Sequence, residues 1–169
     1  AAAKRRGGRF ARARGEALPF PAGAFDLVTV ACAFHWCEPA PLLAEVRRVL
    51  APGGGLAVYD HWMRGEMEGE PRFAAWWEAY KAKFPPPPRH ANFDAAKAAG
   101  FRPVAKDRFE HFVPRTADRV VACPASQSNV LAAGGDPSAE LRAGLAPLFP
   151  GGAPRPVAYA GELDLLQPA

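Results

Sequence analysis

Several features that would assign the chain to a common class are absent. No apolar run approaches the roughly eighteen residues of a membrane span, and no charged segment precedes an apolar one as in a secretion signal. Cysteine is scarce, and Cys32, Cys37 and Cys123 are odd in number and irregularly spaced, which argues against a disulfide framework. These absences predict a cytoplasmic protein with no membrane partner.

Acidic residues are missing from the first fifteen positions, where the positive charge is concentrated. The chain has 21 basic residues, of which six precede the first acid, Glu16; the other 15 face 17 acids. Such an arm can hold nucleic acid through phosphates, but no further basic patch accompanies it, so we expect no nucleic-acid partner. We interpret residues 1–14 as a basic N-terminal arm.

What is present begins with a strand, a helix and a second strand in under forty residues. Phe25–Ala31 is rich in β-branched and apolar residues, which predicts a strand buried on both faces. Apolar residues at helical spacing predict a helix from about Pro41 to Leu50, and Gly55–Tyr59 reads as the second strand. A unit of this kind predicts parallel strands joined by a right-handed crossover.

The rest of the chain alternates helical and extended patterns. An aromatic stripe over residues 70–84 predicts a helix, as a core face or as the wall of a substrate pocket. Residues 101–114 and 157–166 read as strands, and Ser138 is expected to cap a helix that runs to Leu148. The predicted fold class is therefore α/β.

Two segments carry a resemblance to a known family. GEALPFPAGAFDLVTVACAFHW (residues 15–36) and EVRRVLAPGGGLAVYD (residues 45–60) resemble class I methyltransferases that use S-adenosylmethionine, of the type 11-like kind. Residues 112–130 and 157–166 are similar to the trans-aconitate methyltransferase-like branch, which includes enzymes that methylate small organic acids. The resemblance implies a partial Rossmann-like methyltransferase fold. It further implies that residues 1–14 are either a basic arm or a remnant of the family's third strand, and that residues 15–169 form the C-terminal part of a single methyltransferase domain. Its sheet would be mainly parallel, with helices on both faces and the first strands missing.

The resemblance also implies a site for S-adenosylmethionine. Glu16, with Ala17 and Leu18 alongside, matches the positions that hold the adenine. Cys32 and Trp36 follow the strand at residues 25–31, where ligands of doubly wound sheets bind. An indole beside a sulfonium adds cation attraction, so Trp36 is expected to contact the donor. We expect Glu16, Cys32, His35 and Trp36 to border one concavity.

Two histidines are the candidate catalytic residues. His35, and His61 at the expected end of the second strand, could take a proton from the acceptor or orient its carboxylate. A structural hydrogen bond is the alternative role of His35, and Asp60 is interpreted as a strand-end cap. Cys32, His35 and Cys37 are too crowded for a tetrahedral zinc site, so we expect no metal. Glu45, Arg47 and Arg48 read as the solvated face of the helix.

The family's glycine-rich donor turn and its ribose-binding acid do not occur in the sequence. We therefore expect an N-terminally truncated chain, either a fragment or a degenerate relative, that binds little or no donor by itself. The function expected of the parent protein is transfer of a methyl group from S-adenosylmethionine to a small-molecule acceptor, for which a carboxylate is the candidate. The alternative is a non-catalytic binding or scaffold remnant. The sequence identifies neither the methylated atom nor the oligomeric state.

Overall fold

A computed structural model describes residues 10–85, 93–125, 127, 130, 134 and 136–169. Most of the basic arm and the start of the segment after Pro85 thus lie outside the described residues. The chain divides into two compact units. Unit 1 comprises the described residues of Ala1–Asp60, His90–Asp107 and Glu162–Ala169, and unit 2 those of His61–Arg89 and Arg108–Gly161.

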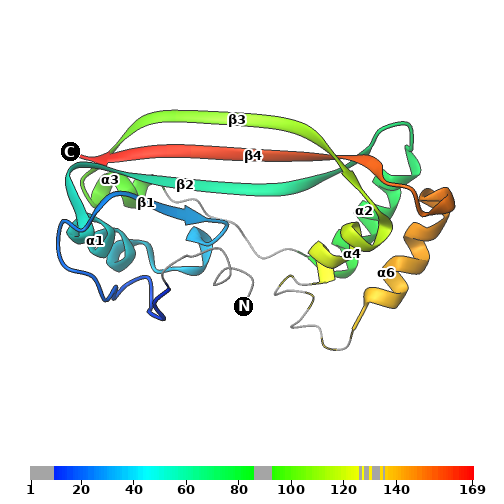
Figure 1. Cartoon of the computed structure of the whole chain (residues 1–169), viewed down its shortest axis with the longest axis horizontal. Coiled ribbons are helices and arrows are strands. Elements are labelled where there is room, and N and C mark those ends of the chain that lie inside the picture. The colour runs from blue at the N-terminus through cyan, green and yellow to red at the C-terminus, as the bar shows by residue number, and fades with distance from the viewer. Residues whose placement is uncertain (1–9, 86–92, 126, 128–129, 131–133, 135) are drawn as a thin grey trace. The chain divides into compact units, whose positions relative to one another are not determined.

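One sheet of four strands runs through the fold in the order β1-β2-β4-β3 (Figure 1). The strands are β1 (Phe25–Ala31), β2 (Leu50–Met67), β3 (Phe101–Arg115) and β4 (Arg155–Pro168). β1 and β2 are parallel, as predicted, with pairs from Leu27↔Gly55 to Ala31↔Tyr59. The helix between them, α1 (Pro39–Val49), also confirms the predicted strand–helix–strand unit.

β4 runs antiparallel to both of its neighbours, so the sheet is mixed. At its C-terminal end the backbone N–H of Ala169 donates to the carbonyl oxygen of Gly100, just before β3 begins. Near its start, Pro156 accepts from the N–H of Glu68, just after β2 ends. The start of β4 thus lies beside the end of β2, and the end of β4 lies beside the start of β3, which is the arrangement of antiparallel strands.

The core of unit 1 lies between α1, α3 (Phe93–Ala98) and the sheet. Leu42, Leu43 and Val46 of α1 are buried at helical spacing. They pack with Leu56 and Val58, which lie two residues apart on β2 and so point to the same face. The helix predicted from the apolar spacing therefore docks on the sheet through the residues that define that spacing.

The prediction that β1 is buried on both faces is wrong. None of its residues is buried; from Leu27, which is 52% exposed, to Ala31 exposed residues alternate with half-buried ones. Among the described residues, β1 pairs with β2 alone and packs through Val28 and Val30 against the core of unit 1. A strand with one neighbour and one covered face buries only alternate side chains.

Helices α2 (Arg72–Lys83), α4 (Ala117–Ala125) and α6 (Ser138–Leu145) of unit 2 pack around an aromatic core. The aromatic stripe of α2 forms a core face, which is one of its two predicted roles, because Phe73 and Tyr80 are buried. The cap expected from Ser138 is wrong, because the Asp136 carboxylate instead accepts the Ser138 backbone N–H at 2.9 Å.

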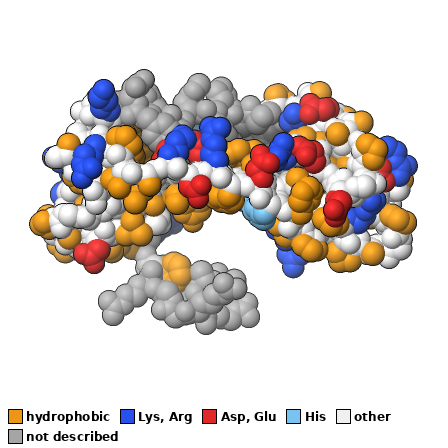
Figure 2. All heavy atoms as spheres, turned by 90° about the horizontal axis from the view of Figure 1, so that it is seen from above, with side chains coloured by type: hydrophobic (Ala, Val, Ile, Leu, Met, Phe, Trp, Pro, Cys, Tyr) orange, Lys and Arg blue, Asp and Glu red, His pale blue; other side chains and the backbone are white. Residues whose placement is uncertain are grey.

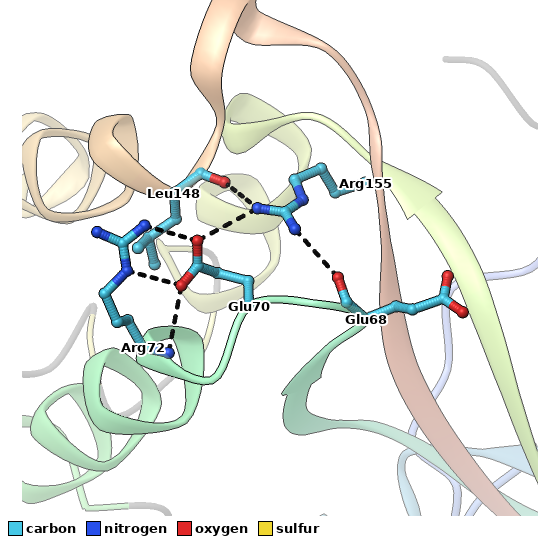
Figure 3. A network of polar contacts seen from close by, with 5 residues as sticks. All are labelled: Glu68, Glu70, Arg72, Leu148 and Arg155. Atoms are coloured by element: carbon cyan, nitrogen blue, oxygen red, sulfur yellow. Dashed lines mark hydrogen bonds and ion pairs between the residues drawn. The ribbon is translucent and has the colours of Figure 1, made fainter.

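A buried carboxylate ties the β2–α2 turn to β4 within unit 2 (Figure 3). Glu70 accepts two hydrogen bonds from the Arg72 guanidinium at 2.7 Å and one from Arg155 at 3.3 Å. Arg155 also donates to the carbonyl oxygens of Leu148 and Glu68. The hydrogen bonds from Arg72 hold the pKa of Glu70 at about 2, below its ordinary value of 4.5.

β3 ends the strand order on the side opposite β1 and carries charged side chains. Figure 2 looks onto the molecule from that side and shows basic and acidic side chains interspersed. Lys106 pairs with Glu162 and Asp164 of β4, and Glu110 pairs with Arg64 of β2. Charges on an edge strand discourage pairing with other chains. None of the described helices is long and apolar enough to cross a membrane.

Candidate functional site

The turn after β1 places the predicted donor-site residues at the carboxyl end of a parallel strand. Cys32 adopts a left-handed conformation with φ +48°, and its backbone N–H donates to the carbonyl oxygen of Tyr59 at 2.8 Å. This sharp bend leads into a single 3₁₀ turn, Phe34–Trp36, anchored by the buried Phe34. The His35 and Trp36 rings lie 4.9 Å apart, and Trp36 is 59% exposed.

Two buried polar atoms of unit 1 have no hydrogen-bond partner among the described residues. They are Nδ1 of His35 and Oδ1 of Asp60. The interpretation of Asp60 as a strand-end cap is wrong, because β2 continues past it to Met67. Buried polar atoms are nearly always paired in folded proteins, so unpaired ones are candidates for binding a ligand or water.

Glu16 lies in a tight turn in which Arg14 and Ala17 form a β-bridge. Its pKa is lowered because its own backbone N–H donates to the carboxylate, with the Arg14 charge and the Glu38 N–H adding to the effect. Burial, together with the charge of Glu16, raises the pKa of the Cys37 thiol. The turn therefore holds an ionised carboxylate near the start of α1.

Glu45 and Arg48 of α1, which the sequence analysis interprets as solvated, hydrogen-bond to the loop at residues 18–20. Glu45 accepts the backbone N–H of Leu18 at 2.7 Å, and Arg48 donates to the carbonyl oxygens of Leu18 and Phe20 at 3.1 and 2.8 Å. The hydrogen bond from Arg48 lowers the pKa of Glu45 to about 2. Arg47 likewise binds the Ala99 and Gly100 carbonyls. Glu45 and Arg48 thus position the loop at residues 18–20. In the sequence, the only sign of this anchor is the spacing of three positions between the acid and the base.

His61 does not lie where the sequence predicted. It is an exposed residue in the middle of β2 rather than at its end, and it belongs to unit 2. The strand is longer than expected because Met63 and Met67 continue its alternation into the core of unit 2. The other predicted site residues, Glu16, Ala17, Leu18, Cys32, His35 and Trp36, all belong to unit 1.

An open cavity occurs in unit 2. Its volume is about 370 Å³, and Glu66–Pro71, Ala74 and Phe112 line it. The concavity expected beside Glu16, Cys32, His35 and Trp36 stays a prediction. In the described part of the chain, no three metal-ligating side chains gather.

Comparison of sequences relates the first third of the chain to methyltransferases. Residues 1–58 match the family described as methyltransferase domain. A demethylmenaquinone methyltransferase of Thermus thermophilus is 51% identical over 53 residues, which are 31% of this chain and 24% of that protein. An uncharacterized methyltransferase of Mycobacterium tuberculosis is 46% identical over 43 residues, 25% of this chain and 18% of the relative. The matches thus span a quarter or less of these curated relatives.

Comparison of structures extends the likeness in fold to nearly the whole chain. A candidate type II methyltransferase from Anaeromyxobacter dehalogenans superposes with a TM-score of 0.64 at 23% identity, covering 94% of this chain and 70% of that one. The [4+2]-cyclase SpnF superposes with a TM-score of 0.50 at 21% identity, covering 99% of this chain and 60% of that one. These likenesses confirm the α/β Rossmann-like fold. A fold shared with a cyclase does not by itself determine the reaction.

Proposed function

We propose that the parent protein transfers a methyl group from S-adenosylmethionine to a small-molecule acceptor, and that unit 1 carries part of the donor site. The observation that carries the proposal is the match of residues 1–58 to the methyltransferase domain. That match includes the Glu16 turn, β1, and the Cys32–Trp36 bend. Sites of doubly wound sheets lie at this carboxyl edge of the strands.

The groups at this edge fit a donor that carries a positive charge and a polar nucleoside. Bound S-adenosylmethionine would supply an electrophilic methyl group on a sulfonium. The exposed Trp36 indole offers a π-face that attracts such a cation. The unpaired Oδ1 of Asp60 and Nδ1 of His35 offer hydrogen-bonding positions, and the Glu16 carboxylate can accept from an amine or hydroxyl.

Positioning is the main task that we assign to these residues. Methyl transfer needs the acceptor aligned with the donor and water kept away, more than it needs new covalent chemistry from the protein. The Glu45–Arg48 anchor fixes the loop beside the Glu16 turn, so the adenine-binding segment Glu16–Leu18 is held before the ligand arrives. His35 is the candidate for receiving a proton from the acceptor.

The donor affinity of the 169-residue chain follows from what the sequence contains. The glycine-rich turn that the family resemblance places before Gly15 does not occur in it. A micromolar ligand is bound by about 8 kcal/mol, and three missing hydrogen bonds remove about 1 kcal/mol each. We therefore expect a dissociation constant on the order of 100 µM or weaker.

Calorimetric titration of the folded chain with S-adenosylmethionine tests the proposal. We expect weak, saturable binding that Trp36→Ala weakens further, because the substitution removes the π-face offered to the sulfonium. Trp62→Ala is the matched control, because Trp62 is also exposed but belongs to unit 2. Micromolar affinity would contradict the expectation of an incomplete site. No saturable binding by a chain with a cooperative unfolding transition would contradict the donor-site proposal and favour the scaffold alternative.

A further inference from the structure

The open cavity of unit 2 lies at the turn between β2 and α2 and combines apolar with acidic side chains. Its described lining includes the apolar residues Met67, Pro71, Ala74 and Phe112 and the acids Glu66, Glu68 and Glu70, with no basic residue among them. A cavity of about 370 Å³ is large enough for a small organic molecule. Such a molecule would meet apolar surface and carboxylates together, so the charge left on each carboxylate decides what binds.

Glu70 is satisfied within the protein and does not serve a ligand. Its buried carboxylate accepts hydrogen bonds from the guanidinium groups of Arg72 and Arg155. It also accepts the backbone N–H of Arg72 at 3.3 Å, so a carboxylate of the protein already occupies the N-terminus of α2. Neither arginine is among the described residues that line the cavity. The described lining therefore offers no positive group to an anion.

Glu68 carries the negative charge that remains available. Its carboxylate forms no ion pair or hydrogen bond with the described residues. Figure 3 shows this carboxylate directed away from Glu70, while the backbone carbonyl of Glu68 accepts from Arg155 at 3.1 Å. Glu66 shares the guanidinium of Arg64 with a second carboxylate on β3, so one positive charge faces two negative ones. The acidic side of the cavity is therefore not neutralised by these contacts.

Phe112 gives the cavity an aromatic surface. This residue of β3 is 55% exposed, although phenylalanine is usually buried. The face of an aromatic ring attracts organic cations. Met67 is 6% exposed and packs in the core of unit 2, so part of the apolar lining is held in place by that core.

These lining groups suit an organic cation better than a metal ion, because no three metal-ligating side chains gather in the described part of the chain. We propose that the cavity binds an organic ammonium ion that has an apolar body. Glu68 accepts the ammonium N–H groups, the Phe112 ring lies against the cation, and Met67 contacts the apolar body. All of these residues belong to unit 2, so the proposal goes beyond the donor site of unit 1 and does not depend on it.

Benzylammonium is the probe for the full chain, with no methyl donor present. The chain contains two methionines, so isotope labelling of their methyl groups gives two NMR resonances, which Met63→Leu assigns. Met67 lines the cavity, whereas Met63 lies in the core of unit 2 outside the lining. We expect a saturable shift of the Met67 resonance with a dissociation constant on the order of 1 mM, while the Met63 resonance stays unchanged.

The need for positive charge is tested with two ligands and two variants. Benzyl alcohol is neutral and benzoate is negative, so each should bind at least about fivefold more weakly than benzylammonium. Glu68→Gln removes the charge and keeps the shape, and should weaken benzylammonium binding about two- to fivefold. Glu78→Gln is the matched control, because Glu78 is an exposed acid of α2 outside the lining, and it should leave the affinity unchanged.

The aromatic contact is tested in the same titration. Phe112→Leu removes the π-face but keeps an apolar side chain, and should weaken benzylammonium binding about two- to fivefold. Phe109→Leu is the matched control, because Phe109 is also exposed on β3 but lies outside the lining.

The outcomes decide the proposal as follows. A Met67 resonance that does not shift with about 20 mM benzylammonium, or equal binding of benzyl alcohol, would overturn it. Equal affinities of Glu68→Gln and Glu78→Gln would overturn the role of Glu68, and equal affinities of Phe112→Leu and Phe109→Leu would overturn that of Phe112. An unchanged Met63 resonance in each variant shows that the core of unit 2 is intact, so a weakened affinity is not the result of unfolding.

Discussion

Replacement of Gly65 by alanine tests the packing of β2 against α2 in unit 2. Gly65 has φ +84°, and a Cβ placed there would lie 2.0 Å from Cδ1 and 2.5 Å from Cγ of Trp77. The Trp77 ring cannot simply withdraw, because it is stacked on Tyr80 at 5.2 Å. The substitution therefore combines a strained backbone with a steric clash.

The two contributions can be estimated separately. A left-handed backbone conformation costs an alanine about 1–2 kcal/mol. Forcing an additional methyl group into a packed interior costs about 1–3 kcal/mol more. Gly151→Ala is the matched control in the same unit, because Gly151 has φ +67° and no atom near its Cβ position. We expect Gly65→Ala to lower the free energy of unfolding by about 1–3 kcal/mol more than Gly151→Ala does.

Urea unfolding followed by far-ultraviolet circular dichroism measures both variants. A double-mutant cycle with Trp77→Ala then isolates the clash, since the extra loss should shrink once the ring is removed. Equal destabilisation by the two glycine substitutions, or full additivity in the cycle, would refute the close packing of Trp77 on Gly65.

Two further predictions concern the buried carboxylate of unit 2 and the helix of unit 1. Because the pKa of Glu70 in the folded chain is about 2, below its ordinary 4.5, its stabilising effect should be fully present above pH 4.5 and lost as the pH falls toward 2. Glu70→Gln should flatten this acid dependence in urea unfolding, and an unchanged dependence would contradict the network with Arg72. Leu43→Ala should cost about 2–5 kcal/mol because Leu43 is fully buried on the face of α1 that packs against the sheet. Leu27→Ala, on the exposed face of β1, should cost under about 0.5 kcal/mol in the same thermal or urea assay.

Local periodicity was enough to predict the elements that hold the site of unit 1. The β-branched run at Phe25–Ala31 predicts a strand, and the apolar spacing in α1 predicts a helix, each from a few neighbouring residues. Trp36 and His35 could be placed because they immediately follow that strand. The degree of burial of β1 could not be predicted, since it depends on which neighbours a strand has.

Contacts that depend on the pairing of distant strands could not be predicted from the sequence. His61 is predicted at a strand end, but β2 continues beyond Asp60 because Met63 and Met67 point into the core of unit 2. The His61 ring lies 4.9 Å from the Tyr159 ring, and this contact depends on the pairing of β2 with β4, which no local pattern specifies. The binding of Arg48 to the loop carbonyl at Leu18 joins residues thirty positions apart and was equally invisible.

The central claim, that the strand ends of unit 1 form a methyl-donor site, is tested most directly by locating the bound ligand. The measurement is a nitrogen–proton NMR titration of the four indole N–H groups with S-adenosylmethionine, with Trp36→Phe to assign the key resonance. The account predicts a saturable shift of the Trp36 indole while the Trp62 indole in unit 2 stays unchanged. Shifts confined to the Trp62 indole, or none at Trp36 at a concentration where calorimetry shows saturation, would contradict it.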